Sequence, residues 1–103
     1  MILPYILFYI NLLLMSHEEI KNLIDSGHAD EAMKMTEAAL AEKPDDALLH
    51  FLHGRCFMKE SRWGEAISCF LKAEAIDPQS PARESREMLC DIMDFYNKDM
   101  YNQ

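Results

Sequence analysis

Hydrophobic and polar positions divide the chain sharply near residue 15. Residues 1–15, MILPYILFYINLLLM, are apolar at thirteen of fifteen positions and carry no charge. The 28 charged side chains, 10 Lys and Arg and 18 Asp and Glu, all follow this segment. We therefore expect an apolar leader, residues 1–14, ahead of a folded domain that spans residues 15–103.

The leader is open to several interpretations. A membrane-spanning helix needs about 20 apolar residues, and no Lys or Arg precedes Lys21 to form the basic flank of a signal peptide. Secretion or membrane anchoring is therefore disfavoured, but it remains one of four alternatives. The others are an extra helix packed on the domain, a dimerisation segment, and an extension upstream of a natural start at Met15. Ser16 and Glu19 form a capping box directly after Met15, which favours the extension.

Start and stop signals predict five helices after the leader. Pro44 and Pro78 lie in polar segments that interrupt the apolar pattern. Asp46 and Ser80 are good N-caps, and Pro81 suits the first position of a helix. The predicted helices span residues 16–26, 29–42, 46–60, 63–76 and 81–97.

The chain repeats itself at an offset of 34 residues, and such a period indicates a helical repeat protein. Gly54 lies midway along the third predicted helix, where a small residue lets two helices approach closely, while Phe57 and Phe70 fill the space beside it. Five identities fall within fourteen aligned positions: Glu31 with Glu65, Ala32 with Ala66, Ala39 with Ala73, Ala41 with Ala75, and Pro44 with Pro78.

The second repeat resembles a tetratricopeptide repeat. Trp63-Gly64-Glu65-Ala66 is similar to the start of that family's second helix, whereas His50 and His53 replace its usual aromatic residue and Leu. The first repeat keeps fewer of the pattern's residues and has Thr36 in the position of Phe. The residues of the second repeat that stand in register with the pattern are Gly54, Phe57, Ala66, Phe70, Ala73 and Pro78.

The resemblance implies an all-α fold, an α-α superhelix of two antiparallel helix pairs with a capping helix. The repeats span residues 13–46 and 47–80, and the cap spans residues 81–97. In the cap, a polar outer face is expected, because terminal repeats need one for solubility. Its inward face is predicted to hold Ala82, Arg86, Leu89 and Met93, with Met88, Ile92 and Tyr96 beside them.

Composition narrows the function further. A net charge of -8 argues against nucleic acid or an anionic membrane as the main partner, because both attract basic surfaces. Three cysteines in a chain of 103 residues do not suggest a disulfide scaffold, so a reducing, cytoplasmic location is expected.

The sequence offers no catalytic, cofactor or metal motif. The three glycines are isolated, so no phosphate-binding loop is present, and no nucleophile elbow occurs. The spacing of His50, His53 and Cys56 does not keep all three on one narrow face, so core packing is favoured over a metal site. Cys56, Cys69 and Cys90 are interpreted as small apolar residues.

The resemblance also implies a concave face, lined by the first helix of each repeat, that binds peptides or protein segments. Phe51 and Leu52 would form an apolar floor, and four of the ten basic residues map to this face. Such a groove suits an acidic or C-terminal segment, with Arg55 and Arg86 holding a carboxylate. The alternative is that these are ordinary solvated charges. The predicted groove residues are Lys21, Leu48, Phe51, Leu52, Arg55, Lys59 and Arg86.

Two functions remain open at this level. The first is a noncatalytic interaction module, an adaptor or scaffold, that binds a protein or peptide in its groove. The second is a structural subunit of a homo-oligomer or a larger assembly, which the leader could attach to a membrane. Two repeats are fewer than the three that a stable stack usually needs, which makes self-association plausible.

Overall fold

The computed structural model describes residues 17–101, which form helices joined by short loops, with no strand among them. The first helix is described over residues 17–25. It is followed by α2 (Ala29–Glu42), α3 (Ala47–Lys59), α4 (Trp63–Ile76) and α5 (Ala82–Tyr101). The predicted bounds of the second and fourth helices are confirmed. The leader and the Ser16 side of the predicted capping box lie outside the described residues.

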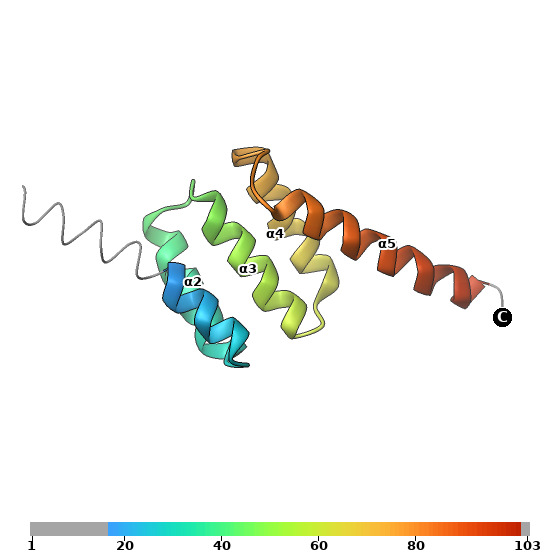
Figure 1. Cartoon of the computed structure of the whole chain (residues 1–103), viewed down its shortest axis with the longest axis horizontal. Coiled ribbons are helices and arrows are strands. Elements are labelled where there is room, and N and C mark those ends of the chain that lie inside the picture. The colour runs from blue at the N-terminus through green and yellow to red at the C-terminus, as the bar shows by residue number, and fades with distance from the viewer. Residues whose placement is uncertain (1–16, 102–103) are drawn as a thin grey trace, which may run out of the picture.

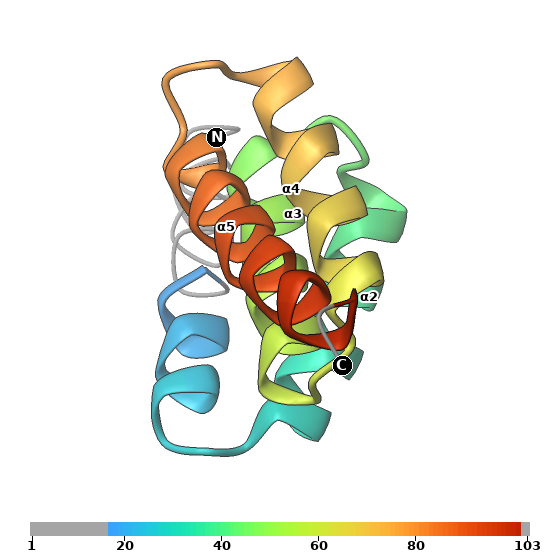
Figure 2. The same ribbon diagram turned by 90° about the vertical axis from the view of Figure 1, so that its right-hand side faces the viewer.

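The helices stack in chain order, each against its neighbour. Contacts join α2 to α3, α3 to α4 and α4 to α5, and Figure 1 shows this succession from the first helix to α5. Figure 2, turned by 90°, places α2 and α4 on one side of the molecule and the first helix on the other. The all-α, repeat-like architecture predicted from the sequence is therefore confirmed.

Local chemistry explains where α3 and its neighbours begin and end. The Asp46 carboxylate accepts a hydrogen bond from the Leu49 amide at 3.1 Å, which satisfies a donor that the helix leaves unpaired. Asp46 also meets His17 of the first helix, with Nε2 and Oδ2 2.9 Å apart. Gly27, which follows the first helix, has φ of +87°, a conformation that glycine adopts without steric cost.

The core centres on the contact between α3 and α4. Gly54 is so close to Phe70 that a Cβ added at position 54 would lie 2.5 Å from the ring. The sequence prediction of a close approach at Gly54 is confirmed. Phe51 packs against the same ring, with the two centroids 5.8 Å apart. The largest fully buried side chains are Phe70, Ile20, Ile24, Leu49, Leu89, Thr36 and Cys56.

The capping helix differs from its prediction in three ways. It runs past Asn97 to Tyr101. It starts at Ala82, and the buried Ser80 hydroxyl has no hydrogen-bond partner among the described residues, so Ser80 does not act as the expected side-chain cap. Met88 and Ile92, expected beside the packed face, are 52% and 45% exposed.

The place of α5 at the end of the stack accounts for these exposed residues. Helix α3 contacts both α2 and α4, whereas the main contact of α5 among the described helices is with α4. One side of α5 is therefore left uncovered by the described helices. Ala82 is fully buried, whereas Leu48, 34 positions earlier, is 39% exposed. The cap thus presents a different face to the stack than α3 does.

Candidate peptide-binding face

Three of the predicted groove cations gather around one carboxylate. The guanidinium of Arg55 on α3 bonds to Asp25 on the first helix, with Nη2 and Oδ1 2.8 Å apart. This hydrogen bond, aided by the charges of Arg55, Lys21 and Lys59, holds the pKa of Asp25 below its usual range despite partial desolvation. We call Lys21, Arg55 and Lys59 the cation cluster. On its other side, Lys59 lines a second hollow together with Asp30, Glu31 and Glu60, so carboxylates other than Asp25 also lie near the cation cluster.

A shallow pocket adjoins the cation cluster at the end of α3. Its volume is about 350 Å³, and Arg55, Met58, Lys59 and Trp63 line it. We call it the tryptophan pocket, because Trp63 is the one tryptophan of the chain. Trp63 is 40% exposed, and an exposed indole supplies a large apolar surface for a ligand. Cationic and apolar surfaces thus meet within one turn of helix.

Trp63 was not among the predicted groove residues. The sequence interpretation used it as part of the motif that begins the second helix of a repeat, which is a structural role. Its remaining exposure could not be inferred from that motif, because exposure depends on how α3 packs beside it. A large apolar residue directly after a loop was the one available signal.

The predicted apolar floor is divided between surface and core. Leu48 is 39% exposed, and Phe51 is half-buried against Phe70. Leu52 is only 2% exposed, so it belongs to the core and offers a ligand almost no surface. Helix α3 contacts both α2 and α4, and this two-sided packing covers Leu52.

Arg86 lies between α5 and α4 instead of joining the cation cluster. Its Nε and Nη2 donate hydrogen bonds to the two Glu74 oxygens, at 2.8 and 3.2 Å. This pairing lowers the pKa of Glu74 below its usual range. The residues 34 positions before Glu74 and Arg86 are Leu40 and Leu52. The ion pair between α4 and α5 therefore occupies repeat positions that hold apolar residues in α2 and α3. Arg86 is therefore already bonded within the fold.

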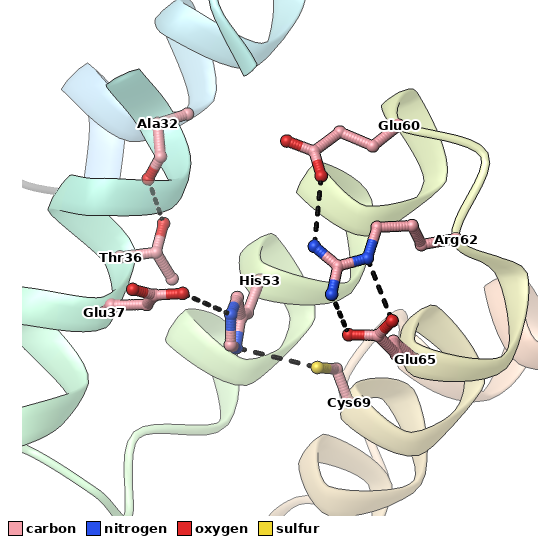
Figure 3. A network of polar contacts seen from close by, with 8 residues as sticks. All are labelled: Ala32, Thr36, Glu37, His53, Glu60, Arg62, Glu65 and Cys69. Atoms are coloured by element: carbon pink, nitrogen blue, oxygen red, sulfur yellow. Dashed lines mark hydrogen bonds and ion pairs between the residues drawn. The ribbon is translucent and has the colours of Figure 1, made fainter. Parts of the chain in front are cut away.

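A second polar network lies between α2, α3 and α4 (Figure 3). The Nδ1 atom of His53 is 3.6 Å from the Cys69 sulfur. Its buried Nε2 is 3.7 Å from Glu37 Oε1, which is too far for a hydrogen bond. The Thr36 hydroxyl donates to the Ala32 carbonyl at 2.6 Å. Burial raises the pKa of the Cys56 thiol to about 11, so this thiol stays protonated and unreactive at neutral pH.

The network does not form a metal site. His50 contacts the Pro44 carbonyl oxygen at 2.7 Å, on a different side from His53. Among residues 17–95, no group of three or more His, Cys, Asp or Glu side chains could hold a metal ion. At the corner between α3 and α4, Arg62 bonds to Glu60 and Glu65 (Figure 3). The guanidinium carbon of Arg62 also lies 4.7 Å from the centre of the Phe57 ring.

We expect His53 to make stability depend on pH. Burial lowers the pKa of His53, more than the Glu37 carboxylate raises it. Unfolded His53 therefore takes up a proton at a higher pH than folded His53 does. Its contribution to stability is complete above about pH 6.5 and is lost as the pH falls through this value toward the folded pKa.

Urea unfolding of the wild type and of His53→Leu tests this dependence. Between about pH 7.5 and 5.5, the free energy of unfolding should fall more steeply in the wild type. The difference between the two proteins isolates His53, because the other groups titrate in both. Equal slopes would contradict the assignment. The depressed pKa values of Asp25 and Glu74 act at more acidic pH, outside this window.

Comparison with known proteins agrees with the arrangement of the helices. No helix in the described part of the chain is long and apolar enough to span a membrane. No curated protein matches the sequence. Bacteroides fragilis protein BF1650, whose structure was determined by NMR in solution, is 36% identical with a TM-score of 0.74, over 84% of this chain and 89% of that one.

The sequence model of the tetratricopeptide repeat family matches residues 23–85, which is more than half of the 103 residues. This range includes the described helices from the end of the first to the start of α5. The chain therefore belongs to the tetratricopeptide repeat family, whose members generally mediate protein–protein interaction.

Proposed function

We propose that this protein is a noncatalytic adaptor that binds an acidic peptide segment with an apolar anchor at the cation cluster and the tryptophan pocket. The convergence of Lys21, Arg55 and Lys59 on Asp25, next to exposed Trp63, is the observation that carries the proposal. A ligand carboxylate would share or replace Asp25 as the partner of Arg55. An apolar side chain two or three residues away would lie on Trp63 and Met58.

The ion pair between Asp25 and Arg55 suits such an exchange. The Asp25 side chain is 49% exposed and the Arg55 side chain 28%, so water already reaches both. Exposed pairs of this kind contribute little to stability, because solvent screens them. An incoming carboxylate can therefore take over the guanidinium without disrupting the core, and the planar guanidinium can accept it in a bidentate geometry.

Selection from a random dodecapeptide library on the immobilised full chain tests this proposal. We expect the selected peptides to be rich in Asp and Glu and to contain one aromatic or aliphatic anchor. In calorimetric titrations, Lys59→Ala and Trp63→Ala should each weaken the binding of a selected peptide about tenfold, which corresponds to about 1.4 kcal/mol.

The matched control is Lys72→Ala, an exposed lysine on α4. It removes the same charge away from the tryptophan pocket and should leave the affinity unchanged. Asp25→Asn should strengthen binding, since it frees Arg55. If peptides bound Lys59→Ala, Trp63→Ala and wild type equally, the site would have to lie elsewhere.

A further inference from the structure

The outward side of α5 carries an apolar strip that no described helix covers. Met88 and Ile92 lie one turn apart and are 52% and 45% exposed. The buried side chains Ala82 and Leu89 occupy another side of the same helix. Exposed apolar side chains one turn apart form a continuous apolar surface, of the kind through which an amphipathic helix docks in a groove.

Acidic side chains run alongside this strip. Glu84 and Asp91 are exposed and make no ion pair within the described part of the chain, whereas Glu87 bonds to Arg83 at 3.1 Å. At 100° per residue, positions 84 and 91 fall beside position 88 on the helix surface. We call Glu84, Met88, Asp91 and Ile92 the outer face of α5.

The helix is also long enough to reach a neighbouring molecule. It has 20 residues and α4 has 14, which correspond to about 30 Å and about 21 Å. Figure 1 shows the C-terminal half of α5 extending beyond the stack formed by α2, α3 and α4. Part of the outer face is therefore presented away from the rest of the protein.

We propose that the outer face of α5 is itself a ligand of the cation cluster and the tryptophan pocket, in a second copy of this chain. The two surfaces complement each other: acidic and apolar side chains on α5 meet cationic and apolar side chains around Trp63. Direct pairing of two α5 helices would instead bring their acidic side chains together, which like-charge repulsion disfavours. This inference rests on the proposed function and names its partner.

Two copies related by a two-fold axis form the contact twice, since each supplies one α5 and one cation cluster. This doubling matters for stability. A stable interface buries about 1,200–2,000 Å² in total, more than a few turns of one helix provide. Because charge contributes to both contacts, raising the salt concentration should weaken the dimer, and dimers should dissociate on dilution.

Charge reversal on each surface tests the proposal by sedimentation equilibrium of the full chain. Lys21→Glu with Lys59→Glu reverses the cation cluster, and Glu84→Lys with Asp91→Lys reverses the outer face. Each double variant alone should associate at least tenfold more weakly than the wild type. An equimolar mixture of the two should regain association, because every contact in the mixed dimer again joins opposite charges.

Matched controls carry the same changes in charge away from both surfaces. They are Lys34→Glu with Lys72→Glu, and Glu42→Lys with Asp45→Lys, all at exposed positions. Both should associate as the wild type does. Circular dichroism checks that every variant is folded. If a double variant is unfolded, the single variant Lys59→Glu replaces it for the cation cluster, and Asp91→Lys replaces it for the outer face.

A wild-type protein that stays monomeric at low salt would overturn the dimer. Association that survives both reversals would overturn it as well and would point to the leader or another face. Binding of selected acidic peptides by such a protein would leave the proposed function intact. A wild-type protein that neither binds acidic peptides nor self-associates would contradict both the proposed function and the dimer.

Discussion

Replacing Phe70 with alanine is expected to lower the free energy of unfolding by about 3–5 kcal/mol, the usual loss for a buried phenylalanine. Phe70 is fully buried on α4 and contacts Gly54 and Phe51 of α3. Truncation would leave a cavity between the two helices, and the small residues around it cannot fill the space. Urea unfolding followed by circular dichroism measures the change.

Leu71→Ala is the matched control, because it truncates the neighbouring residue on the same helix. Leu71 is 50% exposed, so its replacement should cost less than about 1 kcal/mol. A natural domain of this size is stable by about 5–15 kcal/mol. Phe70→Ala should therefore remove a large share of this stability, and similar losses for the two variants would show that Phe70 is not the centre of the core.

Introducing valine at Gly54 is expected to cost about 2–3 kcal/mol through overpacking. An added Cβ would lie 2.5 Å from Cε1 and 2.7 Å from Cδ1 of Phe70, and the ring is held on its other side by the core. Valine is a slightly better helix former than glycine, by a few tenths of a kcal/mol. This gain is too small to offset the steric cost, so the net effect should be a clear destabilisation.

A double-mutant cycle identifies the clash as its cause. Phe70→Leu removes the ring atoms nearest to position 54, so valine at that position should cost at least about 1 kcal/mol less in this background. Gly64→Val is the control, because nothing lies within 4 Å of a Cβ at that position. Additive effects of the substitutions at positions 54 and 70 would rule out direct contact as the cause.

Much of the local structure could be predicted because its causes are local. The bounds of α2 and α4 follow from the loops that flank them, and Asp46 caps α3 through an amide three residues away. The family pattern could also be read, since Gly54 and Phe70 occupy two of its characteristic positions. The close contact of the two confirms that interpretation.

The candidate site was only partly predictable. Lys21 and Arg55 share one position of the repeat, so their common face followed from the period alone. Their meeting at Asp25, with Lys59 nearby, did not, because the Asp25–Arg55 pair joins residues 30 positions apart. Arg86 also matched a groove position, yet it bonds to Glu74.

The sequence by itself determined the helices, their breaks, the repeat and the family, because propensity, capping and apolar spacing act within a few residues of each other. The tertiary structure alone decided which charges are paired, that Leu52 is buried and Trp63 exposed, and which side of α5 faces outward. These features depend on the rotation and approach of whole helices. A change of one residue in a loop can alter that rotation while every local signal stays the same.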